Sequence, residues 1–240
     1  MKLQGKTALV TGGTDGIGAQ LIRQLRDKGV TVITQGRNAE RCAATRADGF
    51  DVIEADLGAQ AGVDALLAAI QGRKIDILVN NAGANVDHDF REGAPDLGAS
   101  DATIFLNLSA PIRLIAALMP VLKAQDEAMI VNVTSGLAIA PRAGGPVYCA
   151  TKAGLRSYSQ ALRHQLKGTR VHVLEALPPV VETKMTAGRG SKKMAPEECA
   201  RQFVAAMERD AEEANVGLVK VLQLVHSISP ALARSIMLRF

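Results

Sequence analysis

Two side chains with the spacing needed for proton chemistry stand in the segment "YCATK". Tyr148 and Lys152 are four residues apart, which places them on one face of a helix. An ammonium group beside a phenol stabilises the phenolate and so favours proton transfer through the tyrosine. Because this spacing is common by itself, its meaning depends on the residues that accompany it.

Two more polar residues stand where apolar ones are expected. Ser135 ends the apolar run "AMIVNVTS", thirteen residues before Tyr148. Asn107 lies inside the helical pattern "DATIFLNLSAPIRLIAALMPVL". Taken singly, Ser135 fits a cap at a strand end and Asn107 fits a core hydrogen bond or a helix kink. With "NNAG" at residues 80–83 beside them, we interpret the four polar side chains as one catalytic group.

A glycine-rich stretch, "TGGTDGIG" at residues 11–18, follows the first short apolar run. Gly12, Gly16 and Gly18 stand where a strand passes into a helix. Small residues there let backbone N–H groups and the helix N-terminus approach an anion, such as the pyrophosphate of a dinucleotide. A tight strand-to-helix turn without a ligand is the alternative.

Short, almost continuously apolar runs alternate with longer helical patterns along the chain. This alternation predicts a parallel sheet covered by helices on both faces, with a ligand at the carboxyl ends of the strands. The length of 240 residues and the hydrophobic content of 48% predict a single domain over residues 1–240. The expected strands are residues 7–11, 30–34, 50–55, 75–81, 128–135 and 170–177.

Composition argues against several classes of protein. The 28 basic and 24 acidic residues give a net charge of +4 without a concentrated basic block, so we expect no nucleic-acid partner. The three cysteines are far apart and form no metal-binding spacing, which predicts neither disulfides nor a metal site. We expect no membrane span and a cytoplasmic location, because no uninterrupted apolar stretch approaches about 18 residues.

The order of these motifs resembles the short-chain dehydrogenase/reductase family, single-domain type, over nearly the full length. The matching pieces are "TGGTDGIG", "ADL" at Asp56, "NNAG", Asn107, Ser135, "YCATK" and "PPVVET". The resemblance implies a three-layer, doubly wound Rossmann fold. It also implies an NAD(P)-dependent oxidoreductase that transfers hydride between a nicotinamide and a carbonyl or secondary alcohol.

The resemblance also assigns roles to residues. It makes Tyr148 the general acid/base, and Lys152 its activator and a ligand of the nicotinamide ribose. It has Ser135 hold the substrate oxygen and Asn107 anchor a water of the proton relay. The cofactor-binding residues that it implies are Gly12, Thr14, Asp15, Gly16, Ile17, Gly18, Arg37, Asp56, Leu57, Asn81, Ala82, Gly83, Val133, Tyr148, Lys152, Pro178, Val181 and Thr183.

The turn after the second strand bears on the choice of cofactor. An NAD-binding fold normally presents Asp or Glu there, whereas this chain has Gln35, Gly36, Arg37 and Asn38. Arg37 could pair with the 2′-phosphate of NADP. We therefore expect NADP(H) to be preferred, with NAD(H) as the alternative; Asp15 in the glycine-rich turn is a mild argument against.

The sequence departs from the family pattern in two places. Pro178-Pro179 replaces the usual Pro-Gly, and residues 217–240 replace the usual seventh strand and glycine-rich end. We expect two amphipathic helices there, the second starting at Ser229-Pro230. Both departures and the phrase "ISPALA" are similar to a bacterial subgroup associated with operons for D-alanylation of teichoic acid. The predicted inward face of the first helix is Leu218, Val221, Leu222 and Val225.

The remaining expectations concern partners. Residues 184–198 fall where the family keeps a substrate lid, and their basic side chains could attract an anionic substrate or simply be solvated. We expect a homodimer formed through the apolar helices at residues 101–123 and 147–166. Membrane-surface binding by the C-terminal helices is an alternative to a structural role. A non-catalytic dinucleotide sensor or structural partner is the alternative to an enzyme.

Overall fold

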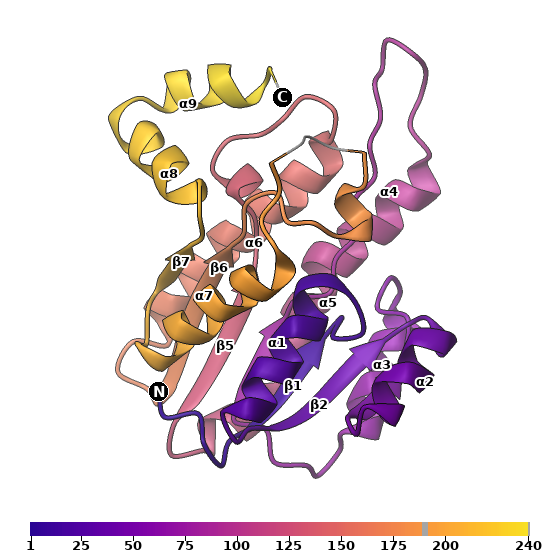
Figure 1. Cartoon of the computed structure of the whole chain (residues 1–240), viewed down its shortest axis with the longest axis vertical. Coiled ribbons are helices and arrows are strands. Elements are labelled where there is room, and N and C mark those ends of the chain that lie inside the picture. The colour runs from indigo at the N-terminus through magenta and orange to yellow at the C-terminus, as the bar shows by residue number, and fades with distance from the viewer. Residues whose placement is uncertain (189–191, 240) are drawn as a thin grey trace.

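The computed structural model describes residues 1–188 and 192–239, which form a seven-stranded parallel sheet with helices on both faces (Figure 1). The strand order is β3-β2-β1-β4-β5-β6-β7, so the direction of winding reverses between β1 and β4. This is the doubly wound arrangement expected from the sequence. The strands are β1 Thr7–Thr11, β2 Thr31–Gly36, β3 Asp51–Glu54, β4 Ile77–Asn80, β5 Ala128–Val133, β6 Val171–Leu177 and β7 Glu213–Asn215.

Two apolar clusters hold the three layers together. One lies between the sheet and α1 (Gly16–Asp27) and α7 (Pro196–Glu208), and the other between the sheet and α3, α5 and α6. Alternate residues of β1 serve the two clusters: Ala8 and Val10 face the first, and Leu9 the second. Burial on both faces explains why the strands are continuously apolar. The remaining helices of the domain are α2 Ala39–Ala47, α3 Gln60–Ala69, α4 Leu97–Ile104, α5 Ala110–Lys123 and α6 Pro146–Gln165.

The seventh strand contradicts the expectation that the chain lacks one. β7 pairs in parallel with β6, in the register Glu175↔Glu213, Ala176↔Ala214 and Leu177↔Asn215. Its three residues, "EAN", are too few and too polar to give a strand pattern in the sequence. Tertiary contacts hold β7 beside β6 instead. The guanidinium of Arg156 pairs with both Glu175 on β6 at 2.8 Å and Glu213 on β7 at 3.2 Å.

The C-terminal extension forms the two expected helices, α8 (Val219–Ile228) and α9 (Pro230–Met237), which lie beyond β7 at one end of the molecule (Figure 1). Ser229 caps α9 by accepting a hydrogen bond from the Leu232 amide at 3.2 Å. The predicted inward face of α8 is wrong in part, because Leu218 and Val221 are 74% and 57% exposed, whereas Leu222 and Val225 are half-buried. Val219, which is 3% exposed, packs inward instead.

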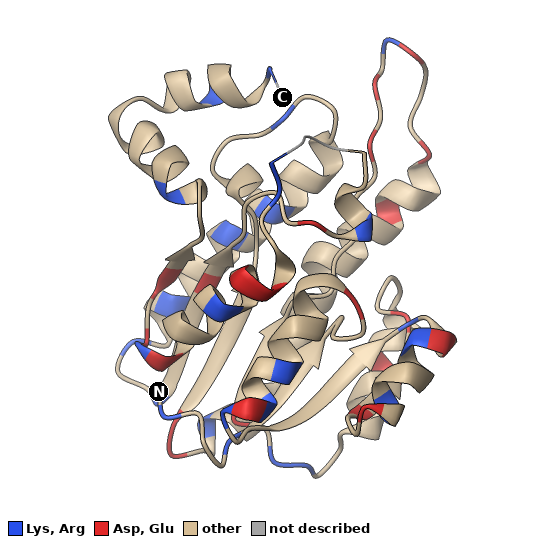
Figure 2. Ribbon diagram, viewed as in Figure 1, with Lys and Arg blue, Asp and Glu red and all other residues tan. Residues whose placement is uncertain are grey.

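Charged side chains of both signs are distributed over the elements of the domain (Figure 2). The three cysteines are buried and unpaired, and burial raises the pKa of the Cys199 thiol to about 12.

One helical stretch, Leu97–Lys123, is long and apolar enough to cross a membrane by length and composition alone. Its inner side chains, including Leu114 and Leu118, belong to the second core cluster.

The buried pair between Arg156 and Glu175 gives a prediction about stability. Removing the cation leaves a fully buried carboxylate without its partner, so Arg156→Met should lower the free energy of unfolding by about 3–5 kcal/mol. Urea denaturation measures the loss. The matched control is Arg170→Met, which removes an exposed pair with Asp126 and should cost less than about 1 kcal/mol. Equal losses in the two variants would contradict the assignment.

Candidate active site

A cavity of about 550 Å³ opens at the carboxyl ends of the strands, where the strand order reverses between β1 and β4. Every residue that the sequence indicated for cofactor binding lines this cavity, together with Ser135 from the predicted catalytic group. Open α/β sheets bind ligands at such a reversal. The lining residues outside the predicted cofactor-binding and catalytic sets include Gln35, Arg41, Ala84, Asn85, Leu106, Thr134, Pro179, Lys184, Met185 and Thr186.

The glycine-rich turn lies directly against the turn after β4. Gly12 has a φ of +67°, and a Cβ atom there would lie 2.9 Å from the Cα of Ala82. A Cβ at Gly18 would lie 2.1 Å from the carbonyl oxygen of Gly12. The Asn81 side chain fixes the contact by donating to the carbonyls of Thr11 at 2.9 Å and Gly12 at 3.1 Å. The two turns therefore pack backbone against backbone, and a side chain at Gly12 or Gly18 would collide with the neighbouring backbone. Glycines that allow such an approach at a helix N-terminus are typical of sites that bind a dinucleotide pyrophosphate.

Gln35 is a positioning residue that the sequence did not reveal. Its side chain is buried at the end of β2 and accepts a hydrogen bond from the Gly12 amide at 3.1 Å. The same side chain donates to the Ala55 carbonyl at 2.5 Å. It thus joins the glycine-rich turn to the neighbouring strand end, a contact between segments more than twenty residues apart.

Asp15 caps α1, with one carboxylate oxygen accepting from the Gly16 amide at 2.8 Å. Its other oxygen pairs with the guanidinium of Arg41 and lies 3.8 Å from Lys184 Nζ. The two cations offset the carboxylate charge at a helix end that would otherwise attract an anion.

Two arginines stand at the end of the cavity beyond β2. Arg37 is largely exposed, and its guanidinium lies 3.9 Å from the carboxylate of Asp56. Arg41 projects from the first turn of α2, where Asn38 caps the helix by accepting from the Arg41 amide at 2.9 Å.

Tyr148 and Lys152 occupy the first two turns of α6, as their spacing predicts. Lys152 is 4% exposed, and its Nζ donates to the carbonyl of Val133 at 2.8 Å. The same nitrogen lies 5.7 Å from the centroid of the Tyr148 ring. Burial lowers the pKa of Lys152 to about 8, so the ammonium form still predominates at neutral pH.

Ser135 follows β5 and begins the short 3-10 helix Gly136–Ala138. Its Oγ accepts a hydrogen bond from the Leu137 amide at 3.1 Å, which is the capping role considered from the sequence. The residue before it, Thr134, donates to Glu175 at 2.7 Å. The serine hydroxyl therefore lines the cavity on a backbone that is held from two sides.

Asn107 is fully buried behind the cavity wall, in a π-helical turn, Phe105–Ser109, between α4 and α5. Its Oδ1 accepts from the Ala84 amide at 2.9 Å, and its Nδ2 donates to the Ala84 carbonyl at 2.8 Å and to Thr151 Oγ1 at 3.1 Å. A Cβ atom at Gly83 would lie 3.3 Å from Asn107 Oδ1 and 3.6 Å from Lys152 Nζ. The side chains of Asn107 and Lys152 thus converge on Gly83 from behind the cavity.

The segment after β6 closes one side of the cavity. Val181 forms a bridge with Met194, and the Glu182 amide donates to the Met194 carbonyl at 2.9 Å. Lys193 donates to the Thr186 carbonyl at 2.6 Å. Arg189, one of the basic residues considered for an anionic substrate, lies outside the described residues.

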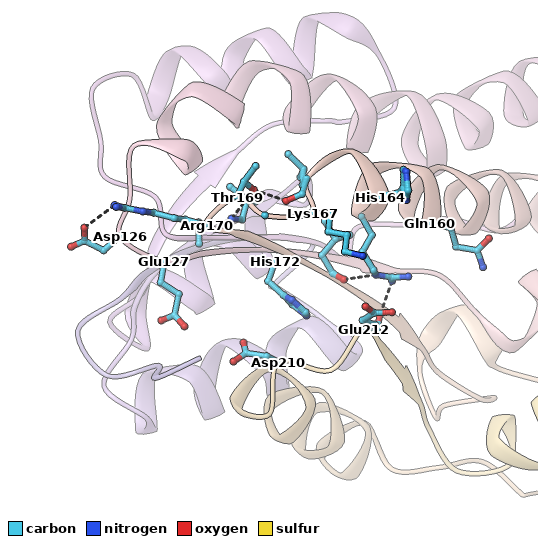
Figure 3. A pocket seen from close by; sticks show the side chains of 16 residues that line it. Asp126, Glu127, Gln160, His164, Lys167, Thr169, Arg170, His172, Asp210 and Glu212 are labelled. Carbon is cyan, nitrogen blue, oxygen red and sulfur yellow. Dashed lines mark hydrogen bonds and ion pairs between the residues drawn. The ribbon is translucent and has the colours of Figure 1, made fainter.

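A second hollow, of about 660 Å³, opens at the opposite ends of β5 and β6 (Figure 3). Charged residues of both signs line it, and Arg170 and Asp126 pair at 3.3 Å while Arg163 donates to the Glu212 carbonyl at 2.7 Å. None of the predicted site residues lies there. Across residues 1–188 and 192–239, no cluster of three metal-binding side chains occurs. The predicted chemistry belongs to the cavity at the carboxyl ends.

Comparison with known sequences fits this geometry. Residues 6–194 match the model of the short chain dehydrogenase family. The uncharacterized oxidoreductase DltE of Bacillus subtilis (strain 168) is 38% identical over 223 residues, covering 89% of this chain and 88% of DltE. The NADP-dependent 3-hydroxy acid dehydrogenase YdfG of Salmonella typhimurium is 36% identical over 180 residues, covering 72% and 71%. The chain therefore belongs to the short-chain dehydrogenase family of oxidoreductases. The likeness to DltE agrees with the bacterial subgroup that the sequence resembles.

Solved structures show the same fold. A short chain dehydrogenase from Burkholderia cenocepacia J2315 in complex with NADP superimposes with a TM-score of 0.88 at 26% identity, covering 99% of both chains. Its coverage includes nearly all of the C-terminal extension of this chain. A short chain dehydrogenase/reductase from Burkholderia phymatum in complex with NAD has a TM-score of 0.80 at 21% identity, covering 95% of both chains.

The burial of Lys152 predicts how stability depends on pH. In the unfolded chain this lysine keeps its ordinary pKa of 10.5, so between pH 8 and 10.5 the unfolded state binds more protons and burial becomes less costly as pH rises. Lys152→Met lacks this dependence. Between pH 7 and 9.5 the wild type should therefore gain roughly 2 kcal/mol of unfolding free energy relative to the variant. Urea denaturation at both pH values measures it, and a constant difference would refute the lowered pKa.

Proposed function

We propose that this protein is an NADP(H)-dependent oxidoreductase that interconverts a carbonyl group and a secondary alcohol, with Tyr148 as general acid/base. The observation that carries the proposal is the place of Lys152. A buried ammonium group lies 5.7 Å from the Tyr148 ring, in the same cavity as a glycine-rich turn that has no room for side chains at Gly12 and Gly18. Burying a lysine costs free energy, which a functional role explains.

In this proposal, each residue of the catalytic group has a separate role in the reaction. A bound nicotinamide cofactor supplies or accepts the hydride at the substrate carbon. In reduction, the Tyr148 hydroxyl donates a proton to the substrate oxygen; in oxidation, the phenolate takes a proton from the alcohol. The Lys152 ammonium stabilises that phenolate and binds the nicotinamide ribose. Ser135 Oγ donates a hydrogen bond to the substrate oxygen and orients it.

Asn107 supports Tyr148, Lys152 and Ser135 from behind the cavity wall. Its amide holds Ala84 and Thr151, and so fixes the turn after β4 to the helix that carries Tyr148. The Oδ1 atom has a second lone pair, which we assign to the water of the proton relay. That water would connect the buried Lys152 ammonium with solvent.

The cofactor lies along the cavity in this proposal. Backbone groups of residues 12–18 hold the pyrophosphate at the start of α1, Asp56 and Leu57 contact the adenine, and residues 81–83 contact the ribose side. Val133, Pro178, Val181 and Thr183 surround the nicotinamide. Arg37 and Arg41 bind the 2′-phosphate, and the NADP named for the Salmonella and Burkholderia cenocepacia relatives supports this choice. A 3-hydroxy acid, the substrate named for YdfG, is the first candidate substrate.

We also propose a cytoplasmic homodimer of single-domain subunits, 1–240. The outer faces of α5 and α6 support the dimer, because they expose small side chains that allow close helix packing: Ala116, Ala117, Ala150, Ala153 and Ala161. Three unpaired cysteines suit a reducing compartment. Light scattering on the purified protein measures the subunit number.

The catalytic assignment is tested with Tyr148→Phe. Removing the hydroxyl should lower kcat by at least about 10²-fold, because it removes the proton donor, while the Kd for NADPH stays within about twofold. The matched control is Tyr158→Phe on the same helix, which should leave kcat unchanged. Steady-state kinetics and fluorescence titration give the two quantities. Activity retained within about tenfold in Tyr148→Phe would rule out the assignment.

Cofactor preference is tested with Arg37→Ala and Arg41→Ala. Each loses a charge-assisted bond to the 2′-phosphate, so the KM for NADPH should rise about tenfold or more. The KM for NADH should change little in Arg37→Ala, whereas in Arg41→Ala it should also rise, because the Asp15 carboxylate at the start of α1 loses a cationic partner. Arg23→Ala, which removes an exposed surface pair with Asp48, is the control. A wild-type kcat/KM for NADH that equals or exceeds that for NADPH would overturn the preference.

The substrate is sought by following NADPH and NADH absorbance with a panel of 3-oxo and 3-hydroxy acids, aldehydes, ketones and diketones. Turnover of any member that disappears in Tyr148→Phe supports the enzyme. Tight cofactor binding with no turnover of the whole panel would favour a cofactor sensor instead.

A further inference from the structure

We propose that the C-terminal extension positions Ser135, and that Val219 of α8 is the positioning residue. The inference rests on the proposed role of Ser135 in holding the substrate oxygen. It gives the extension a part in catalysis, where the sequence indicated only a structural and oligomeric one.

The Val219 side chain packs against Gly136, the residue that follows Ser135. A Cβ atom at Gly136 would lie 3.0 Å from Val219 Cγ2 and 3.6 Å from Leu222 Cδ2, so a methyl group there would crowd α8. Gly136 does not have a positive φ, which means that the contact with α8, and not the backbone conformation, favours glycine. Val219 is 3% exposed and is the best-buried side chain of α8.

The short helix after Ser135 is held on its other side by the segment after β6. The Gly136 amide donates to the Pro178 carbonyl at 3.1 Å, and the Leu137 amide donates to Ser135 Oγ at 3.1 Å. The turn is therefore clamped between Pro178 and Val219. Removing either contact gives the backbone at Ser135 room to move.

The start of α8 is fixed by residues near the cavity. Gly217, at a φ of +54°, turns the chain from β7 into α8, and a Cβ atom there would lie 2.7 Å from Met194 Cε and 3.5 Å from Pro179 Cγ. The Val216 amide donates to the Leu177 carbonyl at 3.1 Å. The extension thus rests on the same segment that closes the cavity, which aligns Val219 with Gly136.

The expected effect is on kcat. Truncating Val219 leaves a space behind Gly136 into which the turn can relax, and a shift of the serine by about 1 Å is enough to cost a large part of the rate. The glycine cradle lies on β1 and α1, so cofactor binding should not change. A purely structural role would lower the melting temperature and leave kcat alone.

A size exchange tests the proposal. In the full chain, Val219→Ala and Gly136→Ala should each lower kcat about tenfold, with the Kd for NADPH within about twofold. The double variant Gly136→Ala/Val219→Ala should recover most of the lost activity, because the added methyl occupies the space left by the removed ones. Val221→Ala, the same truncation on the exposed face of α8, is the matched control and should behave as wild type.

Thermal unfolding and circular dichroism of each variant establish that the folded fraction is unchanged in the assay. A kcat within twofold of wild type in folded Val219→Ala, or a double variant as impaired as the two singles combined, would overturn the proposal. If Val219→Ala does not fold, Gly136→Ala alone decides, since normal turnover in that variant would also overturn the proposal.

Ser135→Ala distinguishes a failure of the proposed function from a failure of the proposed role of α8. Full activity in Ser135→Ala contradicts the proposed function itself, whereas an inactive Ser135→Ala beside a normal Val219→Ala contradicts only the role of α8.

Discussion

The cavity depends on one contact, in which the turn at residues 11–13 meets the turn at residues 81–83. The Thr11 hydroxyl accepts hydrogen bonds from the amides of Asn81 and Ala82, both at 3.0 Å, while the Asn81 side chain donates back to the carbonyls of Thr11 and Gly12. The contact joins the ends of β1 and β4 where the winding reverses. It also sets Gly16, Ile17 and Gly18, at the start of α1, against the cavity.

A second, buried set of polar contacts aligns the helix that carries Tyr148 and Lys152. Asn80 on β4 donates to Asn132 on β5 at 2.8 Å, and Asn132 donates to Ser159 on α6 at 2.9 Å. Ser159 in turn donates to the Leu155 carbonyl of its own helix at 2.7 Å. Buried polar contacts of this kind favour one packing arrangement because other arrangements leave more of these groups unsatisfied. The rotation of α6 relative to the strand ends is thereby set.

Sequence reasoning succeeded where a signal is local and failed where it is not. The first six strands have largely apolar centres, which follow from burial on both faces. The glycine turn and "YCATK" follow from backbone and helix geometry. The sequence did not predict β7, because its three residues, two of them polar, acquire strand structure from β6 and Arg156. The sequence did not predict that Val219 faces inward on α8, because its burial depends on the contact with Gly136, which is distant in sequence. Asn107 gave a clear signal as a polar residue in an apolar helix, but the π-helical turn that holds it is a tertiary result.

The reversal of strand order also governs how the chain reaches its native state. β1, β2 and β3 and their helices come from the first seventy residues, yet β1 pairs on its other side with β4. During synthesis, the β1 edge therefore has no partner until residues 77–80 have left the ribosome, and an unpaired strand edge is a template for aggregation. The cradle is complete only when the two halves of the sheet have joined. A ligand that binds only the folded state stabilises it, so a dinucleotide bound at this cradle would favour the joined state over either half alone.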